Sequence, residues 1–471
     1  MPYFNSVPST TTATAQKSGG PTLVVAASNA KNPSRADYVC TGTNDQTTIN
    51  AALAALPVNN AGQKGGKVLL TEGDYSLGGT INVASFQSLH GTGWGTRMRL
   101  VNGANCWAVT LIPDPTGSNN AQGIEISSFT IDGNSGGQNG GLAAGAAASG
   151  GIIMPGANRC VVHHVFMVSC YTAGIDLPVN TGTGAHPWEN EIHSCLVTLG
   201  QNSPDAANSG FGFNLHDAEE NSIHSNYLEF NGKAHIIDNV VGNNSITNNA
   251  FVNGQVGIQT GGSRGRIANN VFDSLSGHNI RVTGNNNDVH DNAMFLIGTG
   301  AAANSACGVT LNYGASGNNI HHNTIISHGT NGQTKWFIDD NDDYGNNTVN
   351  NMIYDNSLHQ QGTLGSGYIN ATQATTILKG NRVVNDNLGS ALLMRDMASG
   401  VASVAVAAAS VVVTHGMGMT PRRISLTPTT DPQQRYWADT ITNTAFTIRL
   451  AAAAVTTAPS FAWRATFSDD V

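Results

Sequence analysis

Apolar and polar residues recur along most of this chain in one short pattern. Two copies lie 23 residues apart, "NSIHSNYLEFNG" from Asn221 and "NSITNNAFVNG" from Asn244. Each has an isoleucine, an asparagine three residues later and an apolar residue two further on. The isoleucine position recurs at Ile126, Val161, Ile192, Ile223, Ile246, Ile267, Val289, Ile320, Ile353 and Leu378. The position three later is Phe129, His164 and Cys195 in the first three copies and asparagine in the other seven: Asn226, Asn249, Asn270, Asn292, Asn323, Asn356 and Asn381.

A second short pattern lies between these copies. Each example is rich in β-forming residues and has an apolar residue directly before a polar one. The examples are "AGIDL" (173–177), "GFNL" (212–215), "HIID" (235–238), "VGIQT" (256–260), "HNIRV" (278–282), "CGVTL" (307–311), "WFIDD" (336–340) and "GYIN" (367–370). Because the alternation has a period of two rather than 3.6, these segments are predicted to be strands.

Repeats of roughly 20–50 residues indicate a solenoid, and cycles made only of strands indicate a parallel β-helix. Asparagine suits the bend between strands because it tolerates the left-handed conformation and bonds to its own backbone. Asparagines stacked in successive coils can also form a ladder of side-chain hydrogen bonds. The repeat therefore predicts the fold, and it is a structural motif rather than a functional one.

The two ends of the solenoid depart from the repeat. Residues 44–57 form an amphipathic pattern with Pro57 as its stop, which predicts a helix covering the open N-terminal end. Its apolar positions are Ile49, Ala52, Leu53 and Leu56. From about Met397 the asparagine repeat is absent, and alternating segments predict a small antiparallel β-sandwich. The expected organisation is a segment 1–40, a β-helix 41–396 and a sandwich 397–471.

Composition limits the partners of the protein. Only 11% of the 471 residues are charged and the net charge is −9, without a basic run, which argues against nucleic acid. No apolar stretch is long enough to span a membrane, and the first 20 residues lack the features of a signal peptide. The six cysteines show no CxxC spacing and are predicted to be small buried thiols rather than zinc ligands.

The run "ADYVCTGTNDQTTINAALAALP…GGKVLLTEGDYSL", followed by the repeat, resembles the pectate-lyase-like right-handed β-helix superfamily, and most of all bacteriophage tailspike or tail-fibre proteins. The resemblance covers roughly residues 20–395. The tail, with "MTPRRISLTP" and "FAWRA", is similar to phage tail-tip sandwich domains and more weakly to the H-type lectin domain. Together these resemblances imply a single-stranded right-handed β-helix that forms a homotrimer. They also imply an N-terminus attached to a phage tail or baseplate protein, a place in the virion tail, and a host cell-surface polysaccharide as partner.

Carboxylates gather in one part of the second pattern. If its strands stack as one sheet, the polar residue after each apolar one faces outward, in a column that reads Asp176, Asn214, Asp238, Gln259, Arg281, Thr310, Asp339 and Asn370. On this alignment Asp176 and Asp238 are two coils apart, on the order of 9–10 Å. Inverting glycosidases hold an acid and a base carboxyl roughly 6.5–9.5 Å apart. Other candidates for such a role, all within "HDAEEN", are Asp217, Glu219 and Glu220.

Substrate-binding candidates surround the same region. His216 and His235 lie beside the carboxylates in sequence, and His186 and Trp188 lie on an insertion (178–191) where a ring can stack on a sugar. Arg281 is the basic residue of the column, and Trp336, Tyr227 and Tyr344 are further aromatic platforms. The alternative is that the column is only a solvated sheet face and that the aromatic residues pack against the coils.

The segment "DDNDDYGNN" (339–347) has the alternating acids of a calcium loop, but its glycine comes one residue late and no glutamate closes it. No metal site is therefore assigned, no cofactor is expected, and calcium remains an alternative. Three functions stay open: hydrolysis of a polysaccharide by a carboxylate pair, non-catalytic receptor binding by a tail fibre, and a bacterial polysaccharide lyase or epimerase.

Overall fold

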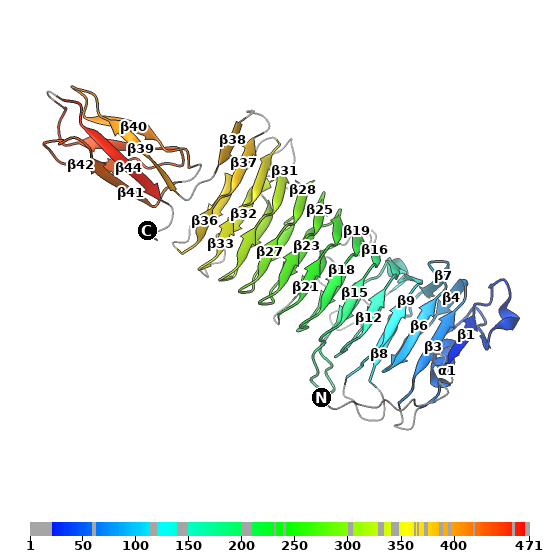
Figure 1. Ribbon diagram of the computed structural model, residues 1–471. Coiled ribbons are helices and arrows are strands. Elements are labelled where there is room, and N and C mark those ends of the chain that lie inside the picture. Colours follow the sequence, from blue (N-terminus) through cyan, green and yellow to red (C-terminus); the bar gives the residue numbers. More distant parts are fainter. Residues whose placement is uncertain are drawn as a thin grey trace, which may run out of the picture.

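The computed structural model describes residues 21–58, 63–113, 120–138, 149–198, 210–229, 232–238, 242–299, 305–327, 334–340, 348–361, 364, 367–371, 375–385, 390–393, 397–417, 420–454 and 457–466. Figure 1 shows an elongated stack of coils with two small sheets beyond its last coil. A complete coil contributes one strand to each of three long sheets, whose strands within the coils are paired in parallel. This confirms the predicted parallel β-helix. No helix among these residues is long and apolar enough to cross a bilayer.

Sheet 1 carries the apolar position of the first repeat. In order along the sheet its strands are β2 (Tyr38–Val39), β1 (Thr22–Ala26), β3 (Gly66–Leu70), β6 (Gln87–Gly91), β9 (Glu125–Ser127), β12 (Val161–His163), β15 (Glu191–His193), β18 (Ser222–His224), β21 (Ser245–Thr247), β24 (Arg266–Ala268), β27 (Asp288–His290), β30 (Asn319–His321), β33 (Met352–Tyr354) and β36 (Ile377–Lys379).

Sheet 2 follows sheet 1 in every complete coil. Its strands are β4 (Gly73–Leu77), β7 (Thr96–Leu100), β10 (Thr130–Asp132), β13 (Phe166–Val168), β16 (Leu196–Thr198), β19 (Tyr227–Glu229), β22 (Ala250–Val252), β25 (Val271–Asp273), β28 (Ala293–Ile297), β31 (Thr324–Ser327), β34 (Ser357–Gln360), β37 (Arg382–Asn385) and the antiparallel β38 (Ser390–Leu393).

Sheet 3 contains the second sequence pattern. Its strands are β5 (Ile81–Ala84), β8 (Trp107–Ile112), β11 (Gly150–Ile153), β14 (Ala173–Leu177), β17 (Phe211–Leu215), β20 (Ala234–Asp238), β23 (Val256–Thr260), β26 (Ile280–Val282), β29 (Ala306–Leu311), β32 (Thr334–Asp340) and β35 (Gly367–Ala371). Two short 3₁₀ helices, η1 (Pro33–Arg35) and η2 (Ser135–Gly137), lie between strands of the first coils.

The N-terminal end of the solenoid is covered as predicted. Helix α1 (Gln46–Ala54) buries Ile49, Ala52 and Leu53 against the first strands, and the side-chain amide of Gln87 donates to the carbonyl of Leu53. Strands β1 and β2 lie within the range 1–40 that the sequence analysis sets apart as an attachment segment. Since β1 pairs with β3, the first sheet begins before residue 41.

The C-terminal sheets are antiparallel and small. One consists of β39 (Met397–Ser403), β44 (Ser460–Thr466) and β41 (Arg423–Pro428), and the other of β40 (Ser410–Thr414), β43 (Ala445–Leu450) and β42 (Tyr436–Asp439). Phe446 of β43 packs edge-on against Trp463 of β44, with ring centroids 5.4 Å apart. The two sheets therefore face each other across an apolar interior.

From β9 to β36 the crossing from sheet 1 to sheet 2 has the same length in every coil. Two residues join the strands, for example between His224 and Tyr227, and the first of them is left-handed. The second lies inside the corner, where the seven asparagines from Asn226 to Asn381 form the expected ladder. Each amide donates to the amide oxygen of the next coil, as from Asn226 to Asn249 over 3.0 Å.

One copy of the repeat lies one residue further along than the sequence alignment places it. Val162, not Val161, pairs with Ile126 and Ile192 and is buried. The residue three later is then Val165 rather than His164. The segment reads "VVHHV", so either valine satisfies the pattern. Of the six cysteines, all free, five are buried and Cys106 is half-buried.

A substitution within the corner ladder tests how much it contributes to stability. Asn270 is fully buried; its oxygen accepts from the backbone and side chain of Asn249, and its amide donates to Asn292. We expect Asn270→Ala to lower the free energy of unfolding by roughly 2–5 kcal/mol, because several buried polar groups lose their partners. Urea unfolding followed by circular dichroism measures the change. The exposed Asn82→Ala, the matched control, is expected to shift it by less than about 0.5 kcal/mol. Equal shifts would contradict the role of the ladder.

Candidate functional site

The outer face of sheet 3 carries the column of residues from which the sequence analysis built its site. Strand pairing gives its actual order as Ile153, Asp176, Asn214, Ile237, Gln259, Arg281, Thr310, Asp339 and Asn370. Asp176 and Arg281 thus occupy the predicted face. Asp238 does not, because Ile237 takes the place expected for it.

Asp238 points into the coil. It is 2% exposed, and its two oxygens accept hydrogen bonds from Thr260 Oγ1 and Asn244 Nδ2, both over 3.0 Å. Burial raises the pKa of Asp238 to about 7. The expected pair of Asp176 and Asp238 on one face is therefore wrong. The segment "HIID" contains two consecutive isoleucines, and the sequence alignment placed the second of them inside.

Asp238 ends a second asparagine ladder, at the corner between sheets 3 and 1. Asn221 donates to Asn244, but the next coil has Gly265 at this position, so Asn244 donates to Asp238 instead. The ladder resumes with Asn287, Asn318 and Asn351, and the last of these donates to Asp340, which is also buried. Both aspartates thus satisfy the amide at the end of a row.

Asp176 contacts another candidate, His216, at the upstream end of the face. His216 Nε2 lies 3.2 Å from Asp176 Oδ1 and 2.7 Å from the side-chain nitrogen of Asn214. The hydrogen bond to Asp176 raises the pKa of His216, although burial opposes the rise. His186 donates from Nδ1 to the carbonyl oxygen of Asp217 over 3.0 Å. The structure thus places Asp176 against His216, and His186 against the backbone of Asp217.

Glu219 and Glu220 lie elsewhere, at the corner where the chain enters sheet 1. Glu219 forms a backbone bridge with Trp188 of the preceding coil, and Glu220 takes a left-handed conformation (φ 57°). The Trp188 ring is covered by the guanidinium of Arg159, 4.9 Å from the ring centroid. The acidic cluster of "HDAEEN" is thus divided between the sheet 3 face and a corner.

His235 is a core residue rather than a substrate ligand. It is fully buried and its ring lies 5.6 Å from that of Phe251. Burial lowers its pKa to about 3. The neighbouring coils have Gly212 and Gly257 at the same place, and a Cβ at Gly257 would approach the Phe272 ring to 2.6 Å.

A groove of about 500 Å³ lies on the face of sheet 3, over β17, β20, β23 and β26. Its floor is apolar and its other lining groups are amides, hydroxyls and bases. Among the described residues it is lined by Phe211, Lys233, Ala234, Ile237, Gln255, Val256, Gln259, Ser276, Gly277, His278, Arg281 and Ser305. Of the predicted site residues it contains only Arg281. The sequence analysis missed Lys233 and Phe211, which precede or begin strands, because it followed a single column.

Aromatic rings flank the groove residues. The Arg281 guanidinium lies over the Tyr313 ring, 5.3 Å from its centroid, and Lys233 Nζ lies 5.5 Å from that of Phe211. Trp336 is two strands beyond Arg281, on β32, and its ring fills the space beside Gly367 of β35. Trp336 is thus on the predicted sheet but not in the groove. Tyr227 is on sheet 2, and Tyr344 lies outside the described residues.

The residues proposed for calcium are divided in the same way. Asp339 accepts a hydrogen bond from Asn370 over 2.8 Å, and Asp340 is bonded to Asn351 and Thr376. Residues 341–347 are not described. In the part of the chain that is described, no three metal-ligating side chains converge.

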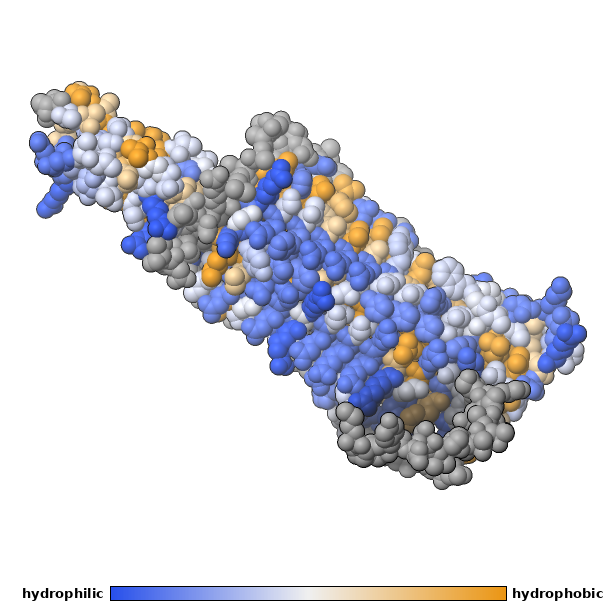
Figure 2. Space-filling model, viewed as in Figure 1, coloured by the Kyte–Doolittle hydropathy of each residue, from blue (hydrophilic) through white to orange (hydrophobic). Residues whose placement is uncertain are grey.

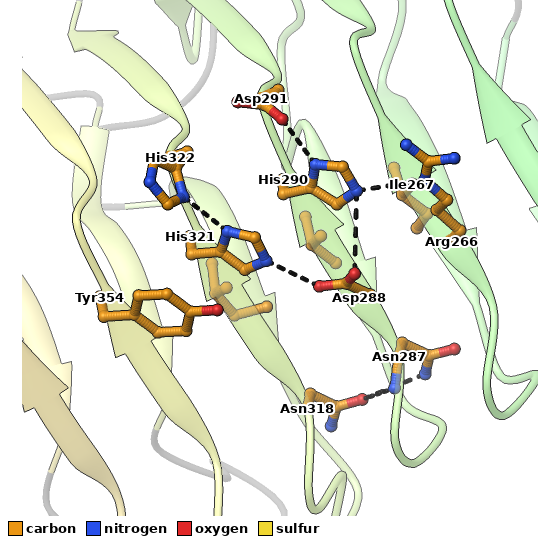
Figure 3. A network of polar contacts seen from close by, with 12 residues as sticks. Arg266, Ile267, Asn287, Asp288, His290, Asp291, Asn318, His321, His322 and Tyr354 are labelled. Atoms are coloured by element: carbon orange, nitrogen blue, oxygen red, sulfur yellow. Dashed lines mark hydrogen bonds and ion pairs between the residues drawn. The ribbon is translucent and has the colours of Figure 1, made fainter.

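Sheet 1 carries a column of stacked imidazoles that the sequence analysis did not use. Figure 3 shows its second half, where His290, His321 and Tyr354 stack with centroids 5.0 and 4.6 Å apart. Asp288 lies 2.9 Å from His321 Nε2, so the acid joins neighbouring coils. Figure 2 shows that the face over β18, β21 and β27 is mostly hydrophilic. Because its carboxylates bond to histidines of the same sheet, the column is interpreted as a coil-stacking network.

Comparison with known proteins agrees with this architecture. No model of a known protein family matches the sequence, and no curated protein matches it. Among solved structures, the tailspike protein of E. coli bacteriophage HK620, a double mutant in complex with pentasaccharide, is similar over 92% of this chain and 91% of its own, with a TM-score of 0.57 and 12% identity. At this identity the likeness is one of fold: the protein has the parallel β-helix architecture of a phage tailspike.

Two bacterial enzymes are also similar. The A-module of a mannuronan C-5 epimerase from Azotobacter vinelandii matches over 73% of this chain and 96% of its own, with a TM-score of 0.45 and 14% identity. DFA-IIIase from Arthrobacter chlorophenolicus A6 matches over 75% and 98%, with a TM-score of 0.48 and 18% identity.

The buried carboxyl of Asp238 makes a prediction about stability and pH. Because its folded-state pKa is raised, its stabilising contribution is complete below the pKa of an unfolded aspartate, near 4, and is lost as the pH rises through about 7. We expect Asp238→Asn to gain stability relative to the unmodified protein across this window, by on the order of 1.4 kcal/mol per pH unit. Urea unfolding at a series of pH values measures the difference. The exposed Asp74→Asn serves as control, and parallel pH curves for Asp238→Asn and the unmodified protein would refute the prediction.

Proposed function

We propose that this chain is a tailspike-like receptor-binding protein that holds a host cell-surface polysaccharide on the outer face of sheet 3. One observation carries the proposal: an open groove with an apolar floor and polar lining lies across four stacked strands of a tailspike-like β-helix. The neighbouring tailspike was solved with a pentasaccharide, which agrees with a saccharide ligand for this fold. The class of ligand proposed for this chain rests on its own groove.

The chemistry of the groove suits a sugar chain. Phe211, Ile237 and Val256 offer apolar surface to the C–H faces of sugar rings, while Gln255 and Gln259 offer amides to their hydroxyls. Successive strands lie about 4.8 Å apart, so four strands form a site longer than one ring. An extended polymer lying along the solenoid fits such a site better than a single small molecule.

The proposal includes the assembly that the resemblance implies. The chain forms a homotrimer, with the C-terminal sandwich contributing to trimer formation, and the N-terminal segment attaches it to a phage tail or baseplate protein. The protein then acts outside the cell as part of the virion tail. The small antiparallel sheets at the C-terminus support this assignment, because they are separate from the β-helix sheets in strand pairing.

Hydrolysis of the bound polysaccharide is a second candidate function. It is favoured by one observation, the placement of Asp176 beside His216 on the same face as the groove. Asp217 follows His216 in sequence, and its negative charge also raises the pKa of His216. In this proposal Asp176 is one of two carboxyls of the reaction, and Asp238 has no part in it.

A variant that fills the groove tests the receptor-binding proposal. Gln259 lies on β23 in the middle of the face, and Gln259→Trp places a large ring between Ile237 and Arg281. We expect labelled protein to bind saturably to at least one encapsulated bacterial strain in a panel and the variant to bind at least tenfold more weakly. Thr247→Trp, on sheet 1 of the same coil, is the matched control and is expected to bind normally. Binding that persists on capsule-deficient mutants of the same strain would refute the proposal.

Product analysis separates binding from hydrolysis. We expect a hydrolase to release reducing ends from the bound polysaccharide, Asp176→Asn to abolish this release, and binding to remain. Mass spectrometry of the polymer after incubation makes the measurement. Unchanged polymer with the unmodified protein removes the hydrolase candidate and leaves receptor binding, and unsaturated products would indicate a lyase instead.

A further inference from the structure

The groove on sheet 3 is lined by basic and neutral groups. Lys233, His278 and Arg281 contribute to its lining, together with Gln255, Gln259 and two serines. Its described lining residues include neither aspartate nor glutamate, in a protein whose net charge is −9. A positive site on a negative protein indicates a ligand that is itself negative, because the rest of the surface repels such a ligand.

Arg281 differs from other arginines of the chain in its partner. Arg97, Arg159 and Arg449 each lie 2.6–2.7 Å from a carboxylate oxygen. Arg281 is instead held against the ring of Tyr313, and the residues beside it in the column, Gln259 and Thr310, are neutral. Its Nε is buried without a hydrogen-bond partner among the described residues. The positive charge is thus not neutralised by the part of the protein that the structure describes.

The ring beneath Arg281 suits this group to ligand recognition. Stacking on an aromatic face orients a guanidinium without using its N–H groups, which remain available to an anion. A guanidinium and a carboxylate or phosphate form two parallel hydrogen bonds, which fix the orientation of the anion as well as binding it.

We propose that the groove binds an acidic polysaccharide, with the anionic group of one sugar on the guanidinium of Arg281. The proposal rests on the proposed function and narrows it to polymers bearing carboxylate, sulfate or phosphate. Lys233 adjoins β20, two strands from Arg281 on β26, so the two bases are about 10 Å apart along the solenoid. This separation favours a polymer with repeated negative charges over one isolated anion.

His278, on the segment that leads into β26, lines the groove with a defined tautomer. Its Nδ1 accepts the backbone N–H of Cys307 over 3.2 Å, which places the proton of the neutral imidazole on Nε2. His278 is therefore a hydrogen-bond donor at neutral pH, like Arg281 and Lys233. All three suit acceptor oxygens on the ligand, as acidic groups provide.

Binding of polymers that differ only in charge tests the proposal on the full-length chain. The probes are polygalacturonate with its carboxyl-reduced form, and dextran sulfate with dextran, each measured by affinity electrophoresis. We expect at least one acidic polymer to bind, its neutral counterpart to bind at least tenfold more weakly, and the affinity to fall as salt concentration rises. Preference for polygalacturonate indicates that the anionic group of the ligand is a carboxylate. Preference for dextran sulfate indicates that it is a sulfate or phosphate ester.

Three variants locate the effect. We expect Arg281→Gln to lose at least tenfold in affinity for the acidic polymer. Arg281→Lys keeps the positive charge but cannot form two parallel hydrogen bonds, and we expect it to lose less. Arg266→Gln removes one positive charge from β24 of sheet 1 and is expected to bind normally. Thermal unfolding of each variant confirms that it is folded.

The outcomes separate this inference from the proposed function. Equal binding of the acidic and neutral polymers, unaffected by Arg281→Gln but blocked by Gln259→Trp, overturns the acidic ligand and leaves polysaccharide binding in place. Failure to bind any of the four polymers, together with failure to bind the bacterial panel, overturns both.

Discussion

Each buried asparagine of the corner ladder between sheets 1 and 2, from Asn226 to Asn356, donates to the corresponding asparagine of the next coil, and Asn381 ends the ladder. Such an amide is satisfied only when the coils are stacked in one register, because a shift of one residue moves each side chain to the opposite face. The columns on sheets 1 and 3 exist because of this constraint. The groove, assembled from four strands that are distant in sequence, depends on it as well.

The polar residues of the chain divide by what they bond to. Some hold the coils together from inside, as Asp238 and Asp340 do at the ends of an asparagine row. Others stabilise the corners or sheet 1, where Glu219 and the stacked histidines lie. A third group faces outward on sheet 3, with Arg281 on an aromatic ring rather than on a carboxylate. Composition alone does not distinguish these groups, since all are polar residues of one solenoid.

The fold could be predicted from the sequence because the repeat shows the length of each coil, the alternation of inward and outward residues in the strands, and the asparagine at the corner between them. The site could be predicted only in part, because it depends on the register of single strands. Where one apolar residue precedes a polar one, as with Ile175 and Asp176, the inward and outward residues were assigned correctly. Where two apolar residues adjoin, as in "HIID" and "VVHHV", the pattern permits two registers.

The second sequence pattern contains a further signal that fixes which residues of sheet 3 face inward. The residue before the inward apolar position is glycine in five coils (Gly151, Gly174, Gly212, Gly257 and Gly308), and alignment on this small residue places His235 inside and Ile237 outside. The groove itself was beyond this reasoning. Lys233 and Phe211 come from neighbouring coils and meet only when the strands are stacked.

The two-residue crossing between sheets 1 and 2 limits where the chain can change in length. From β9 onward this corner always has two residues, whereas the connections on either side of sheet 3 differ from coil to coil. An inserted or deleted residue at the constant corner breaks its ladder, whereas connections of different lengths beside sheet 3 are compatible with stacked coils. Changes in the length of these connections can therefore remodel the borders of the outer face of sheet 3 at little cost in stability. A family of such proteins can diversify its ligands while its framework stays the same.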